Sequence, residues 1–239
     1  MSAPVSDAAS GRLAPADVRA MFDRIAPRYD LMNRLMTAGR DRAWRRAAAA
    51  AADLAAGDRA LDCCTGTGDL AFDLADRTPG GEVVGIDFSE RMIARADEKA
   101  GDRPGLRFEV GDVMNLDHPD DAFDAATVAF GIRNVVDLDG GLHEMARVVR
   151  PGGRVVVLEI TVPAHLQRFY GVWFDRLVPR LGALLGRDAD AYRYLPASVR
   201  RFPAPPELAA RLAGAGLGDV RWRTFAGGIV ALHHGRVRP

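Results

Sequence analysis

The chain has 239 residues, of which 48% are apolar and 27% charged, a composition that is typical of globular proteins and excludes collagen-like, disordered and membrane-spanning classes. Lysine and arginine number 32 in total, and so do aspartate and glutamate. No overall basic field is therefore available to hold a polyanion, and we expect no nucleic-acid partner.

Residues 1–55 are predicted to form a helical extension at the front of the chain. Residues 1–14 are small and polar, and a first helix is indicated by apolar residues at helical spacing before Pro27, namely Val18, Met21, Phe22 and Ile25. A second helix is predicted from Arg42 through an alanine run to Leu54.

Residues 56–160 alternate between strand and helix patterns. Buried strands are predicted at 59–64, 82–86, 106–110, 124–129 and 154–159. Helices are predicted from the turn at 66–68 to about Arg77, from Ser89, and from Leu138 to Val149, where a Pro-Gly-Gly sequence ends the last of them. This alternation predicts an α/β fold with a mainly parallel sheet, covered on both faces, that binds ligands at the carboxyl ends of its strands.

Residues 161–239 have a different character. An aromatic-rich segment spans 165–186, a helix is predicted near 206–213, and two extended runs, from Val220 and over 227–233, predict a C-terminal β-hairpin. We interpret 1–239 as one domain, in which 56–160 form the cofactor-binding core and 161–239 a helical insertion followed by the C-terminal strands.

The cysteines and the N-terminal sequence indicate the cellular compartment of the protein. Cys63 and Cys64 are adjacent, which excludes a disulfide framework and a metal cluster and fits a reducing compartment. The N-terminus MSAPVSDAAS lacks the features of a signal peptide, and no run of about 18 apolar residues occurs. We expect a cytoplasmic protein that holds no metal.

The strongest local signal is the sequence LDCCTGTGDL at 61–70. Gly66 and Gly68 follow a strand and open a helix, so the backbone can approach a ligand and aim helix N-terminal amides at it. Asp87 closes the next strand, and its carboxylate can accept both ribose hydroxyls, because adjacent strand ends lie about 5 Å apart. Asp112 follows the third strand, where it can accept a hydrogen bond from an adenine amino group or cap a turn. Together these residues predict a nucleoside cofactor.

Two cofactors suit this arrangement. A dinucleotide usually requires a third glycine, but Ala71 stands at that position, and an acidic Asp69 at the helix start would repel a pyrophosphate. The excess of acids at the strand ends instead favours S-adenosyl-L-methionine, which carries a sulfonium and an ammonium group. These acids are Asp62, Asp69, Asp87 and Asp112.

Several motifs resemble those of the ubiquinone/menaquinone biosynthesis C-methyltransferase family. They are YDLMN at 29–33, Trp44, LDCCTGTGD at 61–69, FGIRNV at 130–135, RPGGR at 150–154, YRYLPASVRRFP at 192–203 and GGIVALH at 227–233. The resemblance covers about residues 17–235. It implies a class I S-adenosylmethionine-dependent methyltransferase with a Rossmann-like fold that methylates one ring carbon of a prenylated quinol.

The resemblance also implies cofactor contacts, which fall on Thr67, Asp87, Asp112, Val113 and Ala129. Many members have serine at the position of Ala129, so any contact there must come from the backbone. Many also have serine and histidine where this chain has Thr37 and Asp41, so no base is assigned to Asp41.

The candidate catalytic residues are Arg133, Asn134 and Tyr29. Carbon methylation needs an electron-rich ring, and Arg133 could stabilise the phenolate that forms when a quinol hydroxyl loses its proton. The alternatives are that Arg133 pairs with a carboxylate and Asn134 caps a turn. Tyr29 and Asp30 could form part of a lid over the cofactor, or of a hydrogen-bonded helix terminus.

No ligand role is expected for three of the histidines. His143 is predicted to lie on the surface, and His233 and His234 belong to the final hairpin.

The expected substrate is 2-demethylmenaquinol. The benzoquinol intermediate of ubiquinone synthesis, another small-molecule methylation, a nicotinamide dehydrogenase and a non-catalytic scaffold are the alternatives. A prenylated substrate resides in a bilayer, so we expect transient contact with the inner face of the plasma membrane through the segment 165–186, which combines aromatic residues with arginines. Alternatively, its aromatic side chains pack into the core or into a subunit interface such as that of a homodimer.

Overall fold

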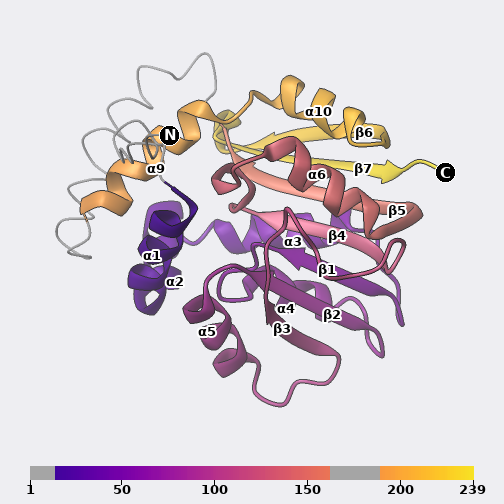
Figure 1. The fold of residues 1–239 in the computed structure, drawn as a ribbon, viewed down its shortest axis with the longest axis horizontal. Helices are drawn as coiled ribbons and strands as arrows, with labels where there is room; N and C mark the ends of the chain where they lie inside the picture. The colour runs from indigo at the N-terminus through magenta and orange to yellow at the C-terminus, as the bar shows by residue number, and fades with distance from the viewer. Residues whose placement is uncertain (1–13, 162–188) are drawn as a thin grey trace, which may run out of the picture.

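The computed structural model describes residues 14–161 and 189–239, and these form one sheet in the order β3-β2-β1-β4-β5-β7-β6 (Figure 1). The parallel strands are β1 (Arg59–Cys63), β2 (Glu82–Asp87), β3 (Leu106–Val110), β4 (Phe123–Ala129) and β5 (Val149–Ile160). β7 (Val230–Val237) runs antiparallel to β5 and to β6 (Leu217–Phe225). The mainly parallel α/β sheet and the C-terminal hairpin predicted from the sequence are confirmed.

Helices cover the sheet on both faces. On one face, α6 (Leu138–Arg147) and α10 (Pro205–Gly214) bury Leu142, Met145, Leu208 and Leu212 against the sheet. On the other face, α3 (Asp41–Ala51) and α4 (Asp69–Ala75) contribute small and branched residues, among them Ala48, Ala49, Leu70 and Leu74. α5 (Glu90–Ala100) lies beside β2 and β3. The alanine run in α3 allows close approach to α4, because each alanine adds only a methyl group.

The N-terminal extension lies beyond the carboxyl ends of the parallel strands. It consists of α1 (Pro15–Ile25), a short 3₁₀ turn (Ala26–Arg28) and α2 (Tyr29–Thr37), as Figure 1 shows on its left side. Val18 and Met21 of α1 pack against Tyr194, and Met32 of α2 packs against Val199. Both partners belong to α9 (Ala189–Arg201). The extension is therefore placed where the sequence predicts ligand binding.

The predicted boundaries of two helices were wrong. Val149 was assigned to the end of a helix, but α6 ends at Arg147 and Val149 is the first residue of β5. The Pro-Gly-Gly sequence lies inside β5, where the pairing with β4 shifts between Phe123 and Ala125 and Gly152 adopts a φ of +80°. The Pro-Gly-Gly residues form a β-bulge in β5, and the strand continues beyond them. α3 also starts at Asp41 rather than at the predicted Arg42, and it ends at Ala51 rather than at Leu54.

The aromatic-rich segment 165–186 lies outside the described residues. Among the residues that are described, no helix combines the length and the apolar character needed to cross a membrane.

Candidate cofactor and substrate site

The loop between β1 and α4 has the conformation that its glycines predict. Gly66 and Gly68 adopt φ values of +58° and +86°, in the left-handed region that favours glycine. A Cβ atom on Gly68 would lie 2.7 Å from the ring of Phe108, so a side chain would also clash there. The loop thus brings its backbone to the carboxyl edge of the sheet and starts α4 at Asp69.

Asp87 at the end of β2 is joined directly to this loop. Its Oδ2 atom accepts a hydrogen bond from the Gly66 amide at 2.9 Å, and its Oδ1 atom accepts one from the Ser89 amide at 2.9 Å. The residue is 6% exposed. Burial raises the pKa of Asp87 to about 6, although both amide hydrogen bonds oppose the shift. Each carboxylate oxygen retains a lone pair for a further donor.

A pocket of about 80 Å³ lies beside Asp87. It is lined by Gly66, Asp87, Asp112 and Val113, four of the predicted cofactor residues, together with Asn134 and Tyr29. Asp112 is exposed, and its Oδ1 atom accepts a hydrogen bond from the Met114 amide at 3.0 Å, which is the turn-capping alternative. The Oδ1 atom of Asn134 is buried without a hydrogen-bond partner in the described part of the chain.

A second, smaller pocket adjoins the first at Gly66. It is lined by Thr67 and Ala129 and contains the acids Asp62 and Asp69 and one basic residue, Arg45. Asp62 accepts hydrogen bonds from the hydroxyls of Thr65 and Thr127 at 2.6 and 2.8 Å. Burial raises the pKa of Asp62 to about 6.

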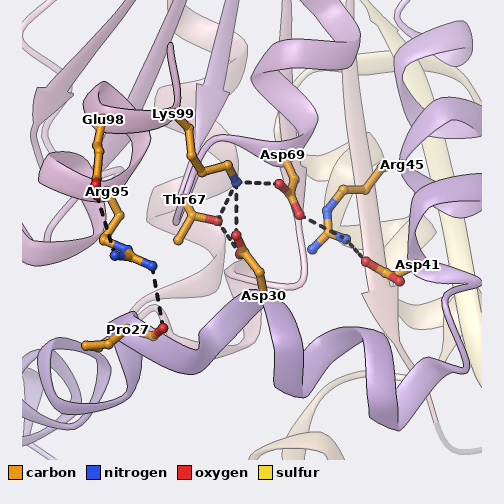
Figure 2. A network of polar contacts seen from close by, with 9 residues as sticks. All are labelled: Pro27, Asp30, Asp41, Arg45, Thr67, Asp69, Arg95, Glu98 and Lys99. Carbon is orange, nitrogen blue, oxygen red and sulfur yellow. Dashed lines mark hydrogen bonds and ion pairs between the residues drawn. The ribbon is translucent and has the colours of Figure 1, made fainter. Parts of the chain in front are cut away.

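A polar network ties the N-terminal extension to this smaller pocket (Figure 2). Lys99, the one lysine of the chain, extends from α5 and contacts Asp69 at 2.6 Å and Asp30 at 3.1 Å. Asp30 accepts a hydrogen bond from the hydroxyl of Thr67 at 2.5 Å. Burial alone would raise the pKa of Asp69, but Lys99 and Arg45 hold it below its usual value. Asp30 is thus both part of a hydrogen-bonded helix terminus and a contact between α2 and the glycine loop.

A larger cavity of about 450 Å³ lies between the extension and the sheet. Its walls are mainly apolar and include Phe22, Met32, Trp44, Phe130, Ile160, Leu195 and Ile229. Tyr29 lines this cavity and both smaller pockets. Burial raises the pKa of Tyr29, although Arg133 and Arg45 oppose the shift. The tyrosine side chain therefore stands where the three spaces meet.

Arg133 lines the larger cavity and pairs with a carboxylate. Its Nη1 atom donates to Oε1 of Glu159 at 2.8 Å and also to the carbonyl oxygen of Phe130. Its Nε atom is buried without a partner among the described residues. Burial alone would lower the pKa of Arg133, but Glu159 and Tyr29 keep it raised. Arg133 therefore pairs with a carboxylate, as one of the two sequence-based alternatives predicted, and it also lines the cavity.

His143, His233 and His234 are not among the residues that line these pockets. His143 is exposed on α6, and a ring nitrogen of His233 is 2.9 Å from the carbonyl oxygen of Pro205. Burial lowers the pKa of His233 to about 4.

The family model for the ubiE/COQ5 methyltransferase family matches residues 10–237. The chain belongs to this family. A demethylmenaquinone methyltransferase of Thermus thermophilus is 50% identical over 90% of this chain and 99% of its own length. One of Deinococcus radiodurans is 46% identical over 92% of each chain. A ubiquinone/menaquinone biosynthesis C-methyltransferase of Geobacter sulfurreducens is 43% identical over 91% of this chain and 87% of its own.

Solved structures agree on the fold. A possible histamine N-methyltransferase of Thermotoga maritima has a TM-score of 0.63 at 21% identity and covers 91% of this chain and 98% of its own. The [4+2]-cyclase SpnF has a TM-score of 0.70 at 19% identity over 98% of both chains. Because a cyclase shares the fold, the fold alone does not define the reaction. The family does define it: the protein is an S-adenosylmethionine-dependent C-methyltransferase.

The residues at the sheet edge fit this cofactor. The pocket beside Asp87 offers a buried carboxylate and the unpartnered Oδ1 atom of Asn134, which suit ribose hydroxyls and an amino group. The smaller pocket offers Asp62 and Asp69, which suit cationic groups. Glu159, Arg45 and Lys99 were not singled out as site residues from the sequence. A glutamate in an otherwise apolar buried strand could have indicated Glu159.

Proposed function

We propose that this protein methylates a ring carbon of 2-demethylmenaquinol and so forms menaquinol. The observation that carries the proposal is the meeting of three spaces at Tyr29, where an apolar cavity large enough for a bicyclic ring adjoins the cofactor pockets. The identity of 41–50% to proteins named demethylmenaquinone methyltransferase supports the same substrate.

The residues around the cavity suit the chemistry of carbon methylation. Loss of a quinol hydroxyl proton places negative charge on the oxygen and on the neighbouring ring carbon. When bound, S-adenosyl-L-methionine would supply an electrophilic methyl group. As the ring carbon bonds to that methyl, the methyl–sulfur bond would break and the electron pair of that bond would stay on sulfur, leaving S-adenosyl-L-homocysteine. The carbon then loses its own proton and the ring becomes aromatic again. Arg133 stabilises the phenolate, Glu159 orients Arg133, and Tyr29 borders the junction at which the quinol ring meets the cofactor.

The substrate assignment is tested with S-adenosyl-L-methionine labelled in its methyl group. The protein is incubated with a prenylated demethylnaphthoquinol or with a prenylated benzoquinol, and the lipid phase is extracted. We expect label in the naphthoquinol. Label in the benzoquinol alone would assign the protein to ubiquinone synthesis, and no label in either lipid would reject quinol methylation.

We also propose that the protein meets the membrane surface to collect this lipid. Leu31 and Leu35 of α2 are 56% and 52% exposed, and Leu35 lines the larger cavity. Apolar side chains beside a cavity for a lipid substrate are suited to an interface with a bilayer. Pelleting with anionic vesicles should fall in a Leu31→Ser/Leu35→Ser variant. It should be unchanged by Val110→Ser, which alters an equally exposed residue on β3. Equal pelleting of all three proteins would remove α2 from this role.

A further inference from the structure

Arg45 of α3 lies between the larger cavity and the smaller cofactor pocket, because its side chain lines both. The side chain is only 7% exposed. Among the described residues that line the smaller pocket, Arg45 is the one basic side chain. Nothing in the proposed methyl transfer uses this buried cation.

The guanidinium of Arg45 is fixed from one side. Its Nη1 atom donates to Oδ2 of Asp41 at 2.7 Å, and Asp41 also accepts a hydrogen bond from the hydroxyl of Thr37 at 2.9 Å. The guanidinium carbon lies 5.2 Å from the ring centroid of Phe130. Within the described part of the chain, the other guanidinium N–H groups of Arg45 make no hydrogen bond. These donors remain available to a ligand.

Asp69, the nearest carboxylate in the pocket, does not neutralise the charge of Arg45. Asp69 lies 4.0 Å from the Nη1 atom of Arg45 but only 2.6 Å from Lys99 (Figure 2). Lys99 is therefore the main partner of Asp69. Arg45 retains positive charge on the side that faces the pocket.

We propose that Arg45, oriented by Asp41, binds the carboxylate of the methionine part of the cofactor. The methionine end of S-adenosyl-L-methionine carries an ammonium group and a carboxylate. Asp62 and Asp69 would repel that carboxylate, so its binding in this pocket requires a cation, and a guanidinium can hold a carboxylate with two parallel hydrogen bonds. Asp41 is a positioning residue, because it acts through Arg45.

The charges around the pocket are negative in excess, which suits a ligand with net positive charge. The network in Figure 2 sets the carboxylates of Asp30, Asp41 and Asp69 against the cations Lys99 and Arg45, which leaves one negative charge. A zwitterionic amino acid with a sulfonium group carries one positive charge. The proposal rests on the cofactor, which the family establishes, and is independent of which quinol is methylated.

The test compares two ligands by titration calorimetry. S-adenosyl-L-methionine has the carboxylate, whereas decarboxylated S-adenosylmethionine lacks it and keeps the ammonium and sulfonium groups. Arg45→Met should weaken binding of the first ligand by about 10–100-fold, the scale of a charge-assisted hydrogen bond. It should change binding of the second ligand by less than about threefold. The neighbouring Arg46→Met, which alters an exposed residue of the same helix, is the matched control and should change neither affinity.

Two further variants keep the test decisive. Arg45→Met leaves Asp41 buried without its partner, so an Asp41→Asn/Arg45→Met variant provides a fold with no buried unpaired charge. It should show the same loss for the carboxylate ligand alone. Asp41→Asn by itself should show a smaller loss, again for that ligand alone. Equal weakening of both ligands, or weakening of neither, would overturn the proposal and leave the pair a structural support of α3.

Discussion

Nη1 of Arg133 lies 2.8 Å from Oε1 of Glu159, and the two side chains are only 8% and 1% exposed. Glu159 also accepts hydrogen bonds from the amide of Ile160 at 2.8 Å and from the amide of Arg133 itself at 3.4 Å. The pair therefore joins β5 to the segment that follows β4. It places a fixed guanidinium in the wall of the larger cavity.

Removing one member of this pair should destabilise the protein strongly. In Glu159→Ala the charge of Arg133 stays buried without a counter-ion, and we expect a loss of about 3–5 kcal/mol in the free energy of unfolding. An Arg133→Met/Glu159→Leu variant should recover most of this loss, because no buried charge remains. Denaturant unfolding measures both values. If the double variant is as unstable as Glu159→Ala, packing rather than charge dominates at this site.

The same double variant should be a poor catalyst that still binds cofactor. If Arg133 stabilises the phenolate, the single-turnover rate of methyl transfer should fall about 10²-fold or more, the scale for loss of one donor to a developing oxyanion. The affinity for S-adenosylhomocysteine, measured by calorimetry, should be nearly unchanged. A normal rate in this folded variant would reduce the pair to a structural role.

Asp87→Ala should weaken cofactor binding by about 1.5–3 kcal/mol, the scale for loss of a charged hydrogen bond. The variant also loses the acceptors of the Gly66 and Ser89 amides, so the glycine loop should loosen as well. Titration calorimetry gives the affinity, and Asp97→Ala, which alters an exposed residue of α5, is the control. An unchanged dissociation constant in folded Asp87→Ala would exclude the ribose role.

Asp87 should also make stability depend on pH. Burial raises its pKa from 3.8 to about 6, so between these values the folded state holds a proton that the unfolded state releases. Stability from this group is therefore lost as the pH rises from about 4 to about 6. Relative to Asp87→Asn, the wild-type protein should lose free energy of unfolding across this range and change little above it. A difference between the two proteins that is constant with pH would show that Asp87 is already ionised at pH 4.

The sequence predicts those contacts in the site that are set by the order of the strands in the sheet, and it does not predict contacts that depend on side-chain direction or tertiary packing. Gly66 lies in the loop just after β1, and Asp87 ends the adjacent parallel strand β2. Their proximity therefore follows from strand order, and the structure bears it out. The pairing of Arg133 with Glu159 depends on the side-chain directions of two segments 26 residues apart, which no local pattern encodes. The assignment of Val149 to a helix failed because its spacing from Met145 fits helical periodicity, whereas pairing with Phe123 decides its state. Lys99 contacts residues of α2 and α4, which reach α5 only through tertiary packing, so these contacts could not be predicted from the sequence.

Lys99 should control how firmly the N-terminal extension closes on the cofactor pocket. Its ammonium group joins Asp30 of α2 to Thr67 and Asp69 of the glycine loop and α4, and no other lysine exists in the chain to replace it. In Lys99→Met the carboxylates of Asp30 and Asp69 lose their shared cation, and α2 loses an electrostatic link to the loop.

We expect faster amide hydrogen exchange over Tyr29–Thr37 in Lys99→Met and a higher dissociation rate of S-adenosylhomocysteine in stopped-flow measurements. The global free energy of unfolding should change by only about 1 kcal/mol, because the side chains involved are partly exposed. Arg103→Met is the matched control, since it removes a comparably exposed cation that pairs with Asp76 away from α2. Unaltered exchange over α2 together with an unaltered dissociation rate would mean that apolar packing against α9, rather than the Lys99 network, keeps the extension closed.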